Sequence, residues 1–229
     1  MRRSSNEFEI YLETGKKRVF AGAIDWPGWC RSGGDEAAAL SALYDYGRRY
    51  AGVLRRAQLG FQAPTDASAL VVVERLEGNV TTDFGAPGKP PSSDAMPVDE
   101  AELERFQELL KACWQAFDDA ARAAEGKQLV KGPRGGGREL EGIIQHVLGG
   151  EAGYLTALGA KLKANASESP DEYLNRSRQV VLETLTRAAH GEVPPQGPRG
   201  GARWSPRYFV RRAAWHVLDH AWELEDRIT

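Results

Sequence analysis

The chain of 229 residues is long enough for one large domain or two small ones, and either arrangement can bury a hydrophobic core. Its 30 Lys and Arg nearly balance its 32 Asp and Glu, which gives no electrostatic reason to expect a nucleic acid or an anionic membrane as partner. Cys30 and Cys113 form no CxxC pair, and no apolar run approaches the length of a membrane span. We therefore expect a cytoplasmic protein that acts on a small molecule.

Residues 1–84 are expected to form a small α+β domain. Phe8, Ile10 and Leu12 alternate with polar residues, and this period of two is typical of a half-buried strand. Residues 19–26 make a plausible return strand after a turn that contains glycine. A Pro-Gly pair then breaks the strand pattern.

The rest of this first domain is expected to contain a helix and a hairpin. Asp35 is a good N-cap for a helix that runs to about Ala57. Residues 70–77 and 80–84 are expected to be two strands joined by a Gly-Asn turn. The predicted order is therefore strand, strand, helix, strand, strand.

The segment 85–97 separates two parts of different composition. It reads GAPGKPPSSDAMP, and so many Pro and Gly residues exclude the interior of a helix or strand. We expect a linker there. Residues 98–229 then read as helical throughout, and an all-α four-helix bundle is the simplest arrangement.

Helix ends in this second domain are predicted from capping residues and from helix-breaking residues. The first helix begins after Asp99, whose partner Glu102 gives a capping-box pattern. The second is expected from about Arg138 to Ala164, and the third from residue 170 or 171 to about His190. The fourth has Pro206 in its first turn and reaches Arg227.

Three histidines are the most informative residues for function. His216 and His220 are four residues apart in the predicted fourth helix, so both imidazoles project from the same face. His146 lies in the second helix and can supply a third nitrogen from across a bundle. Three neutral imidazoles that leave one metal position open are typical of catalytic rather than structural metal sites.

The face of the second helix around His146 is rich in glycine. Gly142, Gly149, Gly150 and Gly153 each lower helix stability by about 1 kcal/mol relative to Ala. Two explanations fit: a facing helix approaches closely, or space is kept beside the imidazole for a ligand. Both explanations bring His146 near other elements.

Less specific interpretations remain open for every histidine. Two histidines spaced four apart are more often a hydrogen-bonded or surface pair than a metal site. The three histidines would then only form hydrogen bonds in a helical core. His190 precedes a glycine at a helix end, where a His caps terminal carbonyls, so we expect capping there.

Two motifs resemble those of a known superfamily. GIIQHVLGGEAGYL at 142–155 and AWHVLDHAWELEDR at 214–227 resemble the second-helix and fourth-helix motifs of the DinB-like superfamily of metal-binding four-helix proteins. That superfamily includes thiol-dependent transferases and maleylpyruvate isomerases. The resemblance covers about residues 98–229 and implies that His146, His216 and His220 bind a metal, with zinc or nickel expected.

The first domain has a weaker resemblance. DWPGWCRSGGDEAAAL at 25–40 resembles the strand-to-helix turn of HicB-like antitoxin domains. No DNA-binding helix-turn-helix or ribbon accompanies it. The resemblance therefore concerns the fold and does not imply repression.

Together these patterns predict a metal-dependent enzyme. The metal would lower the pKa of a bound water or thiol so that it becomes a nucleophile, and a low-molecular-weight thiol is a possible co-substrate. Thiol transfer, isomerisation and hydrolysis all remain open. Glu223, Asp219 and Glu151 are the candidate acid, base or ligand-orienting groups.

The alternative is a non-catalytic module that combines a HicB-like domain with a metal-binding or partner-binding bundle. Such a module would bind metal and change its partner affinity without turnover. A homodimer formed through an exposed helix face is also possible.

Overall fold

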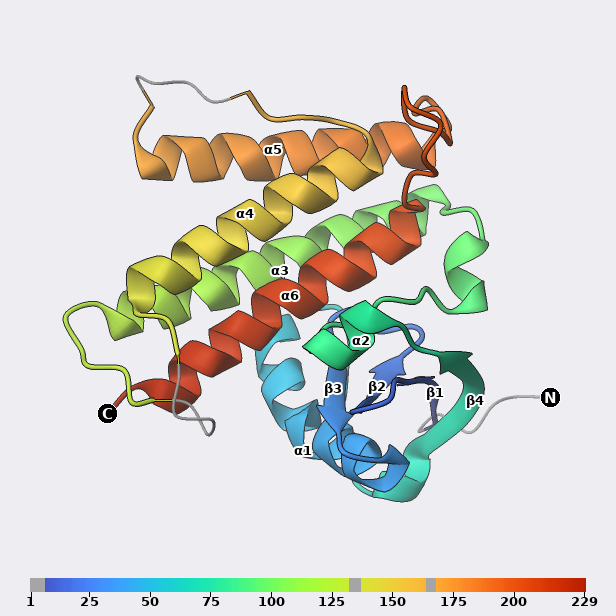
Figure 1. The fold of residues 1–229 in the computed structure, drawn as a ribbon, viewed down its shortest axis with the longest axis vertical. Helices are drawn as coiled ribbons and strands as arrows, with labels where there is room; N and C mark the ends of the chain where they lie inside the picture. The colour runs from blue at the N-terminus through green and yellow to red at the C-terminus, as the bar shows by residue number, and fades with distance from the viewer. Residues whose placement is uncertain (1–6, 132–136, 164–167) are drawn as a thin grey trace. The chain divides into compact units, whose positions relative to one another are not determined.

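The computed structural model of the protein describes residues 7–131, 137–163 and 168–229. The chain divides into two compact units, residues 1–96 and 97–229. The first unit contains a mixed β-sheet, and the second contains helices (Figure 1). The α+β class and the order of the two parts agree with the sequence prediction.

Four strands form the sheet of the first unit. They are β1 (Phe8–Thr14), β2 (Val19–Ala23), β3 (Cys30–Gly33) and β4 (Leu70–Glu77), in the spatial order β3-β2-β1-β4. β1 pairs antiparallel with β2 and parallel with β4, and β2 pairs antiparallel with β3. The short strand β3 is not in the sequence prediction.

Helix α1 (Glu36–Leu54) packs against β2 and β3 and buries the main core of this unit. Asp35 caps it by accepting a hydrogen bond from the Ala38 amide at 2.8 Å, as its sequence position predicts. Trp29 is fully buried and donates its indole N–H to the Leu43 carbonyl at 2.8 Å. The helix is thereby held to the loop that precedes β3.

The predicted hairpin at 70–84 is wrong. Residues Val80–Phe84 form a short helix, α2, and β4 pairs with β1 instead of with them. The Asn79 side chain caps the helix by accepting from the amides of Thr81 and Thr82, and the Thr82 hydroxyl accepts from the Asn79 amide in return. A Gly-Asn pair fits a hairpin turn and a helix start equally well, and this reciprocal cap stabilises the helix.

Strand β1 is also more buried than a half-exposed strand would be, because Ile10 to Glu13 are all buried. The Glu13 carboxylate accepts hydrogen bonds from the amides of Gly88 and Lys89 and from the Thr82 hydroxyl. Much of the segment expected to be a linker therefore packs on the first unit. The boundary between the units falls after Met96.

The described residues of the second unit include four long helices. They are α3 (Glu100–Ala124), α4 (Leu140–Leu158), α5 (Pro170–Ala189) and α6 (Pro206–Arg227). α6 packs chiefly against α3 and α4, and α4 packs against α5 (Figure 1). Asp99 and Ser205 cap α3 and α6 by accepting amide hydrogen bonds. Most of the predicted helix ends agree with these bounds to within two residues.

Helix α4 is shorter than the sequence predicts. It ends at Leu158 because Gly159 adopts φ of 131°, and a Cβ there would come within 2.6 Å of the Val193 side chain. The predicted end, Ala164, lies outside the described residues.

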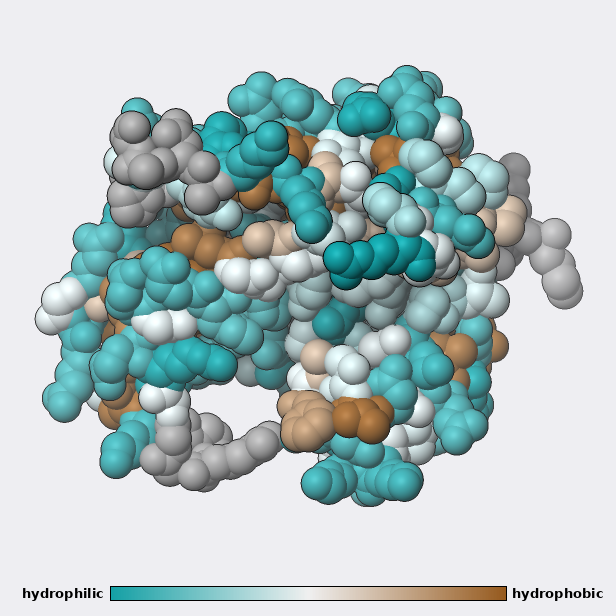
Figure 2. Space-filling model, turned by 45° about the horizontal axis from the view of Figure 1, so that its top comes forward, coloured by the Kyte–Doolittle hydropathy of each residue, from teal (hydrophilic) through white to brown (hydrophobic). Residues whose placement is uncertain are grey.

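Hydrophobic side chains of this unit are mostly turned inward. Leu109, Leu110, Val210 and Leu218 are fully buried between α3 and α6. The face drawn in Figure 2 is mainly hydrophilic, with hydrophobic side chains in small groups. None of the helices among the described residues is both long and apolar enough to cross a membrane.

Candidate metal centre

Three imidazoles converge in the second unit. His216 and His220 lie one turn apart on α6, and His146 faces them from α4. One ring nitrogen from each residue lies within 4.8 Å of the other two. His216 and His220 are buried, whereas His146 is more exposed. The structure therefore brings together the three histidines that the sequence singles out.

The rings are arranged edge to face around a common point. Their centroids are 5.1 Å apart for His146 and His216, 4.8 Å for His146 and His220, and 4.9 Å for His216 and His220. The Nε2 atoms of His146 and His216 are 3.3 Å apart. Two nitrogens bound to the same tetrahedral zinc would be separated by about 3.3 to 3.4 Å, so this pair has the spacing of two ligands. A hydrogen bond between neutral rings has a similar length.

His220 is oriented by a carboxylate. Its Nδ1 lies 2.8 Å from Glu223 Oε2, and the other Glu223 oxygen accepts from Arg227 Nη1 at 2.7 Å. The hydrogen bond with His220 is the largest cause that lowers the pKa of Glu223, so this residue stays ionised. An ionised Glu223 accepts a hydrogen bond from His220 when Nδ1 carries the proton. The Nε2 lone pair of His220 is then available for a metal.

Burial keeps His216 neutral. It lowers the pKa of His216 to about 3, with further contributions from the charges of His220, His146, Arg212 and Arg138. Burial is also the largest cause that lowers the pKa of His146. Neutral imidazole is the form that binds metals. The buried Nδ1 of His216 has no hydrogen-bond partner among the described residues.

The glycines of α4 do not share a single role. A Cβ on Gly150 would lie 2.4 Å from Cε1 of His216, so this glycine lets the imidazole rest against the α4 backbone. A Cβ on Gly149 or Gly153 would meet nothing within 4 Å. Close approach of a facing helix therefore explains the glycine at position 150. It does not explain the glycines at positions 149 and 153.

The other predicted site residues are spread more widely. Glu223 contacts the histidine cluster directly. Glu151 is buried and accepts from the Trp114 indole of α3 at 2.5 Å, so its carboxylate faces α3. Asp219 is partly buried on α6, and its place between the two histidines in the sequence remains the argument for it. His190 occupies the C-cap position of α5, and its side chain contacts a second helix, because its Nε2 lies 2.6 Å from an oxygen of Glu100 on α3.

Three residues beside the histidines are absent from the sequence prediction. Arg212 is buried one turn before His216, Tyr154 packs edge to face on the His216 ring at 5.4 Å, and Arg227 supports Glu223. Arg212 could have been predicted, because a residue four positions before His216 lies on the same face of the helix.

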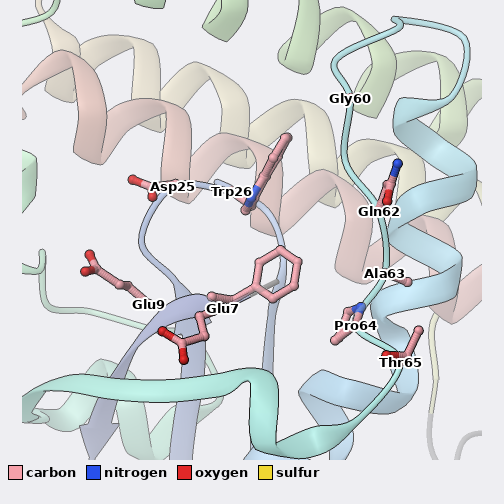
Figure 3. A pocket seen from close by; sticks show the side chains of 10 residues that line it. Glu7, Glu9, Asp25, Trp26, Gly60, Gln62, Ala63, Pro64 and Thr65 are labelled. Carbon is pink, nitrogen blue, oxygen red and sulfur yellow. The ribbon is translucent and has the colours of Figure 1, made fainter. Parts of the chain in front are cut away.

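A separate hollow of about 530 Å³ lies in the first unit. Figure 3 shows Glu7, Glu9 and Asp25 on the left of it, Trp26 beside Asp25, and the segment with Gly60, Gln62, Ala63, Pro64 and Thr65 on the right. Glu9, Asp25 and Trp26 all have interaction partners of their own. None of the described residues that line the hollow is a histidine or a cysteine, and we assign it no chemistry.

No family model, no curated protein and no solved structure matches the chain. The functional interpretation therefore rests on the motifs quoted above and on the geometry of the three imidazoles.

Proposed function

We propose that the protein is a metal-dependent enzyme of the DinB-like type, with α3 to α6 forming a four-helix bundle around the metal. His146, His216 and His220 would hold a divalent ion, zinc or nickel. The observation that carries the proposal is the convergence of three imidazole nitrogens, from two helices, to within 4.8 Å. This separation of up to 4.8 Å between ring nitrogens is larger than the separation of two nitrogens bound to one zinc ion, so metal binding would draw the rings closer together.

Several features of the chain support a metal rather than a set of hydrogen-bonded rings. His216 is neutral and buried, and neutral imidazole is the form that binds a metal. Glu223 holds the proton-bearing nitrogen of His220, an arrangement that is common behind metal ligands. Gly150 provides the space that the His216 ring needs.

A metal held by three imidazoles would supply Lewis acidity, which lowers the pKa of a bound water or thiol. The chain's own residues would then orient the site. Arg227 holds Glu223, Glu223 orients His220, and the backbone of α4 at Gly150 supports His216. Thiol transfer, isomerisation and hydrolysis are the reactions that such a centre would serve, with a small thiol as possible co-substrate.

The test is the metal content of protein purified without a histidine tag, measured by inductively coupled plasma mass spectrometry. We expect about one divalent ion per chain in the wild type and almost none in His216→Ala, because two imidazoles hold zinc much more weakly than three. His190→Ala is the matched control and should keep its metal, because His190 contacts Glu100 away from the cluster. Full metal content in His216→Ala would overturn the proposal.

Metal binding without turnover would instead favour the alternative, a binding module. Activity is therefore measured on the same preparations, with small thiols and with ester substrates. An enzyme loses metal and turnover together in His216→Ala.

A further inference from the structure

The face of α4 that points away from the core is unusually poor in charge. Among the 19 residues of this helix only Glu141 and Glu151 are charged, and Glu151 is buried. A surface helix normally places charged and polar residues on the face opposite its core stripe. Figure 1 draws none of the described helices of the second unit in front of α4. This face therefore lacks the side chains that are typical of a helix surface in contact with water.

Small and apolar residues form this face instead. Gly149 and Gly153 are exposed, and a Cβ at either position would meet nothing within 4 Å. Ile144 and Leu148, which lie beside them, are only half-buried. Small residues on a helix surface allow the backbone of a second helix to approach closely. The open space above these two glycines therefore suits a helix from another molecule.

Charges of opposite sign stand at the two ends of α4. Glu139 and Glu141 are exposed at its N-terminal end, and Lys161 and Lys163 are exposed just beyond its C-terminal end. Arg138 also lies at the N-terminal end, where its charge acts on the histidine cluster. In an antiparallel pair of α4 helices, the acidic end of each copy meets the basic end of the other. A parallel pair would place like charges together and align the helix dipoles, and both effects oppose association.

We propose that two copies of the chain form a dimer in which their α4 helices pack antiparallel around a twofold axis. The axis crosses α4 midway between Gly149 and Gly153, so Gly149 lies opposite Gly153 of the partner subunit. Glu141 then lies near Lys161 of the partner subunit, because each is eight residues outside the glycine pair. His146 lies three and seven residues before the two glycines, so the partner helix borders this more exposed histidine.

The test is sedimentation velocity of the full-length protein at about 1 to 200 µM, with a chelator present so that no metal ion bridges two copies. One helix from each copy makes a small interface, so we expect a monomer–dimer equilibrium with a Kd of about 10 µM. Gly149→Lys should weaken it about tenfold or more, because two like charges enter the centre of the interface. Lys forms helices better than Gly, so thermal unfolding of this variant should occur no earlier than in the wild type.

Charge reversal tests the direction of the helix pair. Glu141→Lys and Lys161→Glu should each weaken the dimer about threefold or more, because each change replaces two attractive contacts by two repulsive ones. The double variant Glu141→Lys/Lys161→Glu should restore the affinity of the wild type. Gln179→Lys adds a charge at an exposed position of α5 and should leave the equilibrium unchanged.

Three results would overturn the inference. The first is a wild type that remains monomeric over the whole range, which would mean that a different partner covers α4. The second is a Gly149→Lys variant that dimerises as the wild type does, because the interface would then lie elsewhere. The third is a double variant that is no better than the single reversals, because the two ends would then not meet. None of these results depends on the metal, so the proposed function is tested separately.

Discussion

At the scale of single residues, two buried carboxylates differ in how many hydrogen bonds they accept. Glu13 is fully buried, and its oxygens accept from two backbone amides and a hydroxyl. Glu151 receives one hydrogen bond, from the Trp114 indole, and its second oxygen has no hydrogen-bond partner among the described residues. A buried carboxylate with so little compensation favours its neutral form.

This difference predicts how stability depends on pH. Burial, the largest cause, raises the pKa of Glu151 from 4.5 to about 7. Between those values the folded protein holds a proton that the unfolded chain has released, so stability falls as pH rises. The loss is about 1.4 kcal/mol per pH unit, or roughly 3 kcal/mol in all. Glu151→Gln should abolish it, because the amide does not ionise.

The measurement is the free energy of unfolding in urea between pH 4.5 and 8, for wild type and Glu151→Gln. The difference between the two curves removes the contribution of all other titrating groups. It should grow in favour of the variant as pH rises. Glu141→Gln, an exposed position on the same helix, should give a flat difference. Parallel curves for wild type and Glu151→Gln would contradict the prediction.

At the scale of secondary-structure elements, α4 contains glycines that stabilise the site and glycines that weaken the helix. A Cβ at Gly149 or Gly153 would meet open space, so Ala at either position should stabilise the protein by about 1 kcal/mol. Ala at Gly150 would push the His216 ring away, and metal affinity should fall by about 10- to 100-fold. Thermal unfolding and a competitive zinc titration measure the two effects. Unchanged zinc affinity in Gly150→Ala would show that the ring does not rest on α4.

The helices were predicted well from the sequence because their ends are marked locally. Asp99 predicts the start of α3 and Pro206 predicts the start of α6, and both helices begin where these residues indicate. The sheet was predicted less well. β3 consists of Cys30–Gly33, four residues without an apolar alternation, and it becomes a strand through pairing with β2. Residues 80–84 are apolar enough for a strand, and the cap at Asn79 makes them helical instead.

The sequence predicts which candidate site residues share one face of a helix, and it does not predict how the helices pack together. A spacing of four residues puts His216 and His220 on one face, and this follows from the sequence alone. The convergence of His146 depends on the packing of α4 against α6, which is a tertiary property. Tyr154 joins Arg212 and His216 for the same reason, since it lies on the other helix. Glu151 sits five residues after His146, and that offset turns it toward α3.

At the scale of the whole molecule, the two units have separate cores. Trp29 and Tyr50 belong to the core of residues 1–96, and the core of the helical unit is formed by residues 97–229. The histidine cluster, Glu223 and Arg212 all belong to the second unit. We therefore expect residues 97–229, expressed alone, to fold and to bind a divalent metal as the full chain does.

Circular dichroism during heating and zinc titration of both forms test this expectation. The zinc affinity of the isolated second unit should match that of the full chain, and His216→Ala in the isolated unit should abolish binding. A folded second unit that has lost its zinc affinity would contradict the prediction. It would mean that residues 1–96 supply a ligand or enclose the site, because three imidazoles on α4 and α6 would then be insufficient on their own.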